Sequence, residues 1–300
     1  MLHSRKIKLG FPLMLLVLAL TGATAFALTI TGTPGPDRIL GSQADDLIDA
    51  QAGNDVVIAR GGNDTVVGRQ GNDRLFGNLG NDNMNGLAGN DVLRGNLGDD
   101  NLVGDNSEVG DLYSIDRLFG GPGADTLHGG DAHDKVFAGA DNDQAWGDGG
   151  PDLIAGGLGD DTLYGGDGND TVFGNQGVDV EYGGPGNDRL TAATQMDPAG
   201  TPGDTIYGED GNDVIRVRDL QADTITCGPG HDRAFLDLQD VIADATEGNM
   251  NGSCERVTRF VPKPGDAQKE DSTQQQPSGD NEAPGSTQVP DGPSGQQPTR

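Results

Sequence analysis

Apolar residues recur at a fixed nine-residue interval along most of this chain, with polar residues and glycine between them. From Gly156 to Phe173 the sequence reads G-G-L-G-D-D-T-L-Y-G-G-D-G-N-D-T-V-F, which is the pattern Gly-Gly-x-Gly-x-Asp-x-apolar-x written twice. Positions seven to nine predict a three-residue strand in which only position eight faces inward, because successive strand residues point to opposite sides. So short a period predicts a solenoid rather than a globular domain.

The aspartate at position six holds the same register. It recurs every nine residues from Asp37 to Asp100 and from Asp116 to Asp188, and seven extra residues separate the two runs. Strands must reverse direction at each glycine-rich turn, so two strands and two turns predict an 18-residue coil. About ten coils stacked roughly 4.8 Å apart would form a rod on the order of 50 Å long. After a second insertion the series continues at Asp204, Asp213, Asp223 (one residue late) and Asp232.

The composition narrows the class of protein further. The 300 residues include 51 glycines and only 4% aromatic residues, so large apolar side chains are too few for a thick core. The net charge is −29. Such a composition usually indicates disorder, but disordered acidic tracts do not keep aspartate and apolar residues in register. The acidic charge argues against a nucleic-acid partner and favours cations.

The turns have the chemistry of a calcium site. Calcium prefers six to eight oxygen ligands in irregular geometry, and glycine-rich turns can expose several backbone carbonyls because glycine accepts a positive φ. Turns 18 residues apart should stack, which places Asp152 beside Asp170 and Asp161 beside Asp179. Cysteine and histidine do not recur in the period, which disfavours zinc and copper. We therefore expect several bound Ca²⁺ ions.

The repeats from Gly32 to about Phe235 resemble the RTX, or haemolysin-type, calcium-binding nonapeptide repeat. The resemblance implies an all-β parallel β-roll, a solenoid of the β-helix type, in which position-six aspartates and turn carbonyls hold calcium between consecutive turns. Turns without glycine at position four, or out of register, should form weak or empty sites: those before Asp46, Asp116, Asp134, Asp143, Asp204 and Asp223. The metal ligands implied are Asp55, Asp64, Asp73, Asp82, Asp91, Asp100, Asp125, Asp152, Asp161, Asp170, Asp179, Asp188, Asp213 and Asp232.

The energetics indicate that calcium is structural. Burying one position-eight side chain contributes about 1.5–3 kcal/mol, whereas ordering nine residues costs roughly 9–18 kcal/mol. We expect most of the roll to be disordered without calcium and to fold as the ions bind. The alternative is a glycine- and aspartate-rich solenoid that is stable without metal.

The two ends of the chain differ from the repeats. Residues 1–27 have the basic start, the apolar run Leu9–Leu20 and the small-residue site Ala25-Phe26-Ala27 of a secretory signal peptide. The alternative is an uncleaved membrane anchor, although the run is short for a bilayer span. We expect a secreted, extracellular mature chain without a membrane span. Residues 262–300 are rich in Pro, Gln and Ser and should be disordered.

Between the roll (28–235) and this tail, residues 236–261 resemble the terminal cap of secreted bacterial calcium-binding repeat proteins. They are richer in apolar residues than the repeats, as a solenoid end requires. Two cysteines in a secreted chain predict a disulfide, with two free thiols as the alternative. The cysteines are Cys227 and Cys254, and the apolar residues are Leu236, Leu238, Val241 and Ile242.

The remaining features leave the role open. The chain has no H-E-x-x-H, G-x-S-x-G or phosphate-loop motif, so we expect a structural or adhesive protein, not an enzyme. One alternative is an enzyme or glycan site in the inserted loops, within Val103–Ile115 and Ala192–Gly203. Another is an outward aromatic stripe at position nine, which could bind a cell-surface glycan or protein or simply pack across strands. The stripe consists of Phe119, Phe137 and Phe173 on one side and His128, Trp146, Tyr164 and Tyr182 on the other.

Overall fold

The computed structural model describes residues 6–8, 26–105, 114–192, 202–217, 219–246, 249 and 252–261. Every helix or strand element in these ranges is a strand, and none of the described residues forms a helix that could cross a membrane. Most of both insertions and the segment 262–300 lie outside the described residues, so the disordered tail stays a prediction.

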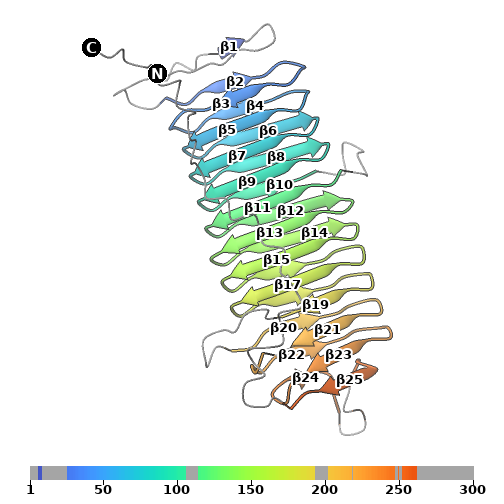
Figure 1. Ribbon diagram of the computed structural model, residues 1–300. Coiled ribbons are helices and arrows are strands. Elements are labelled where there is room, and N and C mark those ends of the chain that lie inside the picture. Colours follow the sequence, from blue (N-terminus) through green and yellow to red (C-terminus); the bar gives the residue numbers. More distant parts are fainter. Residues whose placement is uncertain are drawn as a thin grey trace, which may run out of the picture.

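The strands stack into a rod of coils, and successive strands alternate between two parallel sheets (Figure 1). The larger sheet contains, in order, β1 (Lys6–Lys8), β2 (Thr29–Thr31), β4 (Leu47–Asp49), β6 (Thr65–Gln70), β8 (Asn83–Ala88), β10 (Asn101–Val103), β12 (Thr126–Asp131), β14 (Gln144–Gly149), β16 (Thr162–Tyr164), β18 (Val180–Tyr182), β20 (Thr205–Tyr207), β22 (Thr224–Thr226) and β24 (Val241–Ile242). The second contains β3 (Arg38–Leu40), β5 (Val56–Gly61), β7 (Arg74–Leu79), β9 (Val92–Leu97), β11 (Arg117–Pro122), β13 (Lys135–Ala140), β15 (Leu153–Leu158), β17 (Thr171–Gln176), β19 (Arg189–Thr191), β21 (Val214–Val217), β23 (Arg233–Leu236) and β25 (Arg256–Arg259).

The pairing register confirms the 18-residue coil. Leu75 pairs with Leu93, its equivalent one coil later. Leu93 in turn pairs with Leu118, so the register continues across the first insertion. The chain is therefore an all-strand parallel β-solenoid of about 11 turns, as the repeat predicts.

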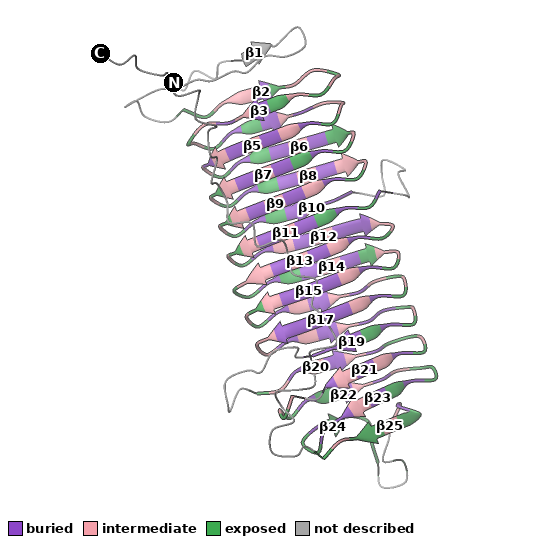
Figure 2. Ribbon diagram, viewed as in Figure 1, coloured by how far each residue is buried: buried purple, intermediate pink, exposed green. Residues whose placement is uncertain are grey.

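The core is a single row of side chains between the two sheets. Position-eight residues such as Leu75, Leu93 and Leu163 are fully buried, while their neighbours at positions seven and nine are exposed or half-buried (Figure 2). The inward direction of position eight is confirmed, and it holds even for Glu181. So thin a core leaves the turns as the other place where the coils contact each other.

Many strands are longer than the three residues expected from the pattern. In β7 and β9 the pairing continues from position seven to position three and includes Asn78 with Asn96 and Leu79 with Leu97. Both asparagines have a positive φ, 84° and 79°. Identical corners in adjacent coils can stack on each other, so the backbone hydrogen bonds continue through the bend.

The two ends of the rod are closed differently. At one end β1 pairs with β2; the rest of the proposed signal segment up to residue 25 lies outside the described residues, so its cleavage stays a prediction. At the other end β25 pairs with β23, and Cys227 and Cys254 form a disulfide with their Cα atoms 5.2 Å apart. Of the apolar residues expected in a cap, Leu236 and Ile242 are buried, whereas Leu238 and Val241 are exposed.

Candidate metal sites in the turns

Most of the described turns bend at two residues in the left-handed region, at positions two and four. In the turn before Asp73 these are Arg69, with φ 85°, and Gly71, with φ 123°. Two turns that lack glycine at position four keep the bend, because Ala132 (φ 93°) and Asp141 (φ 79°) adopt the same conformation. This costs roughly 1–2 kcal/mol for each such residue.

The turns hold the position-six aspartates in a continuous ladder. Asp73 Oδ1 accepts a hydrogen bond from the backbone N–H of Asp55, one coil earlier, at 2.7 Å. Asp91 does the same for Asp73 at 2.7 Å, and Asp116 does so for Asp91 across the insertion, also at 2.7 Å. One carboxylate oxygen of each aspartate is thereby fixed to the neighbouring coil.

The other carboxylate oxygen faces a space lined by oxygen atoms. A Cβ placed on Gly183, at position one, would lie 2.7 Å from Asp188 Oδ2 and 2.5 Å from the carbonyl oxygen of Gly208 in the next coil. A carboxylate oxygen and a carbonyl oxygen from adjacent coils thus converge beside the position-one glycine. Within the described residues, the buried Oδ2 atoms that accept no hydrogen bond include those of Asp55, Asp64, Asp73, Asp82, Asp100, Asp116, Asp125, Asp134, Asp143, Asp152, Asp161, Asp170, Asp188, Asp204, Asp213, Asp223 and Asp232.

Burial makes negative charge on these aspartates unfavourable in the protein alone. Desolvation raises the pKa of Asp161 to about 9 and that of Asp82 to about 7, although a backbone hydrogen bond to each carboxylate opposes the shift. Charge repulsion from Asp179 and Asp143 raises the pKa of Asp161 further. A buried carboxylate without a compensating partner either binds a proton or needs a cation beside it.

A family comparison agrees with this geometry. The family of RTX calcium-binding nonapeptide repeats matches residues 31–66, 58–93, 76–107, 113–145, 146–181 and 203–217, together more than half of the chain. The chain belongs to the RTX calcium-binding nonapeptide-repeat family. RTX repeats bind Ca²⁺, and this family is typically structural and non-catalytic. No curated protein matches the chain.

The residues of these RTX turns suit Ca²⁺. Calcium is a hard cation that takes carboxylate and carbonyl oxygens and tolerates irregular geometry. Beside most position-one glycines a carboxylate oxygen and a carbonyl oxygen lie close together. The carboxylate oxygens there that accept no hydrogen bond include those of Asp161 and Asp188. All the predicted ligand aspartates, from Asp55 to Asp232, are buried at position six.

The position-six aspartates of the turns expected to be weak are placed like those of the other turns. Asp46, Asp116, Asp134, Asp143, Asp204 and Asp223 are all buried. They take part in the same ladder; Asp143, for example, accepts the N–H of Asp125 at 2.7 Å. Burial therefore does not separate these RTX turns from the predicted ligand set, but hydrogen bonding sets the turn before Asp46 apart, because Asp46 Oδ2 accepts the N–H of Ser42 at 2.6 Å. Which sites are occupied stays a prediction.

A second ladder, at position five, was not expected from the sequence. Asn54 Oδ1 accepts the backbone N–H of Asn72 at 3.1 Å, and Asn72 Oδ1 accepts that of Asn90 at 3.1 Å. This exposed ladder runs opposite to the aspartate ladder, so adjacent turns are joined in both directions. Its sequence signal is the recurrent Asn before the position-six Asp, in the triplet Gly-Asn-Asp.

The aromatic stripe forms one long stack and one short one. His128, Trp146, Tyr164 and Tyr182 stack with centroids 4.4–5.1 Å apart, and Tyr207 joins them across the second insertion. The inner rings are nearly parallel and cover each other's faces, so these rings offer no open face to a sugar ring. This favours the packing interpretation of the stripe.

On the other side the expected three-ring ladder is wrong. Phe119 and Phe137 stack at 5.1 Å, but Phe137 pairs with Ala155, and Phe173 comes one coil later. Phe173 is also buried, with only 8% of its surface exposed, so it does not form part of an outward stripe.

Proposed function

We propose that this chain is a secreted structural protein whose RTX roll folds as calcium binds. The observation that carries the proposal is the row of buried carboxylate oxygens without hydrogen bonds, one in almost every turn. Many of them lie close to a carbonyl oxygen of the next coil, so one ion held by both oxygens would contact two coils at once. Calcium would then join the coils where the thin core cannot.

The energies support metal-coupled folding. Transferring an ionised carboxylate from water into a site without partners costs several kcal/mol or more, and the net stability of a folded domain is only about 5–15 kcal/mol. Stacked aspartates such as Asp152, Asp161 and Asp170 repeat that penalty along the rod, since burial raises the pKa of each. Divalent cations remove this penalty only in the folded state, because only there are the carboxylates brought together. A ligand that binds only the folded state drives folding as it binds.

The test uses the chain from residue 28 onward, purified and treated with a calcium chelator. We expect its far-ultraviolet circular dichroism to lose the β signal in chelator and to regain it cooperatively on titration with Ca²⁺. Native mass spectrometry should show several bound Ca²⁺ ions in the refolded protein. An equal β signal and equal protease resistance with and without calcium would refute metal-coupled folding.

Secretion is the second part of the proposal, and it rests on the signal-like residues 1–27. Expression of the full chain in a bacterial host with a general secretion pathway should yield an exported protein that begins near Leu28. A protein that stays in the cell with Met1 intact would contradict this part alone.

A further inference from the structure

The turn between β21 and β22 departs from the repeat. Asp223 follows Asp204 by 19 residues, one more than the regular 18. The backbone N–H of Asp204 still donates to Asp223 Oδ1 at 2.7 Å, so the ladder continues. The family match ends at residue 217, so this turn lies outside it. Position one is also unusual, because it holds the fully buried Val217. An isopropyl group thus occupies the position at which most turns have glycine.

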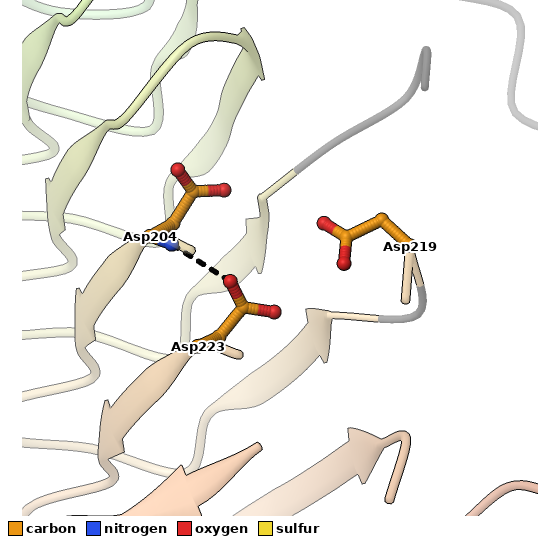
Figure 3. A group of neighbouring side chains, drawn as sticks. All are labelled: Asp204, Asp219 and Asp223. Atoms are coloured by element: carbon orange, nitrogen blue, oxygen red, sulfur yellow. Dashed lines mark hydrogen bonds between the residues drawn. The ribbon is translucent and has the colours of Figure 1, made fainter. Parts of the chain in front are cut away.

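The longer turn brings in a third carboxylate. Asp219 follows β21 in the turn that leads to Asp223, and its carboxylate faces those of Asp204 and Asp223 (Figure 3). Each of the three offers a carboxylate oxygen, and these oxygens all lie within 4.8 Å of one another. Two contacts hold the turn in place: the N–H of Gln221 donates to Asp219 Oδ1 at 2.9 Å, and the N–H of Leu220 donates to Asp237 Oδ2 at 2.8 Å.

Two of the three carboxylates are buried and directed into this cluster. In each of these two, one carboxylate oxygen has no hydrogen-bond partner. Asp204 is 1% exposed and Asp223 is fully buried, and the Oδ2 atom of each accepts no hydrogen bond. Figure 3 shows one oxygen of each on the side facing Asp219. Three converging carboxylates with two unpartnered buried oxygens have the charge and the geometry of a cation site, since like charges this close otherwise repel.

We propose that Asp204, Asp219 and Asp223 form a calcium site of a different type from the RTX turns. The inference rests on the proposed function, because it assumes that the roll binds calcium. Asp219 supplies a side-chain carboxylate from outside the repeat pattern. The affinity of calcium sites rises with ligand charge and with rigidity. This site therefore fills at a lower calcium concentration than the regular turns, and it prefers trivalent lanthanide ions over Ca²⁺ more strongly than they do.

The test compares Asp219→Asn with wild type in calcium titrations followed by native mass spectrometry and calorimetry. Wild type should show one site that fills before the others. Asp219→Asn should weaken that first site tenfold or more and leave the later ones unchanged. The asparagine Oδ1 can still accept the N–H of Gln221, so the turn is preserved; circular dichroism at saturating calcium should match wild type.

Asp210→Asn is the matched control, because Asp210 is an exposed turn residue of a neighbouring coil and the charge change is the same. We expect the control to keep the early site. Terbium(III), added alone to the chelated protein, should also bind first at this site in wild type and not in Asp219→Asn. Identical first-site binding in wild type and Asp219→Asn would overturn the assignment while leaving the proposed function intact. A wild-type chain that binds no calcium would overturn the proposed function itself.

Discussion

Replacing Asp161 with asparagine should have opposite effects with and without calcium. Asp161 lies within the uninterrupted run of repeats from Asp152 to Asp188 and is 1% exposed. Its Oδ1 accepts the N–H of Asp143 at 2.9 Å, and its Oδ2 accepts no hydrogen bond. Asparagine has the same shape, keeps the first contact and removes the negative charge, so the substitution isolates the charge itself.

Without calcium, the substitution should stabilise the roll. Burial raises the pKa of Asp161 from 3.8 to about 9, so at about pH 7.5 folding requires this carboxyl to take up a proton. That uptake opposes folding by about 5 kcal/mol, which is an upper limit for the gain in Asp161→Asn. The new amide can donate to the carbonyl of Gly174, which lies beside the space that Asp161 Oδ2 faces.

With calcium the sign reverses. Loss of one occupied site at a calcium concentration a hundred times its dissociation constant removes about 3 kcal/mol of stability. The loss would be larger if Asp161 contributes to two adjacent sites. The same variant is thus more stable than wild type in chelator and less stable in calcium.

Both signs can be measured by circular dichroism. In saturating calcium, urea unfolding should give a lower midpoint for Asp161→Asn. In chelator, folding can be driven with trimethylamine N-oxide, which favours compact states, and the variant should fold at a lower osmolyte concentration. The matched control is Asp160→Asn: Asp160 is exposed at position five, where other repeats carry asparagine, and it accepts the N–H of Val178 at 2.9 Å. If Asp161→Asn destabilises the protein in both conditions, or behaves like the control, the charge argument is wrong.

Three further predictions concern the pH dependence of stability, the position-five ladder and the disulfide. The metal-free roll should lose stability as pH rises from about 4 through the raised pKa values of 6 to 9, because the folded state binds more protons than the unfolded state in this range. A pH series in chelator, followed by circular dichroism, checks the sign of this dependence. Asn72→Ala removes the acceptor for the N–H of Asn90 and should lower stability by about 1 kcal/mol, whereas Asn72→Asp should not; urea midpoints in calcium compare the two. Reducing the Cys227–Cys254 disulfide should cost roughly 3–4 kcal/mol, and an unchanged melting temperature in reductant would contradict this.

Most of the fold follows from the sequence alone, because the nine-residue period is a local property. An apolar residue at position eight has to face inward, an aspartate at position six has to follow the turn, and an 18-residue coil results. The same reasoning predicts that the position-six ladder residues are oxygen donors for calcium. It needed no knowledge of which coils are neighbours, since every coil repeats the one before it.

The features that only the tertiary structure reveals are found where the repeat is broken and where neighbouring coils contact each other. Strand pairing through the corners, the position-five ladder and the stacking of Tyr207 on Tyr182 depend on which residues lie one coil apart. The sequence marked the turn before Asp223 as defective, but folding brings Asp219 to Asp204 and Asp223 there. The pairing register continues past each insertion, so the length of the break does not reveal which side chains it brings together.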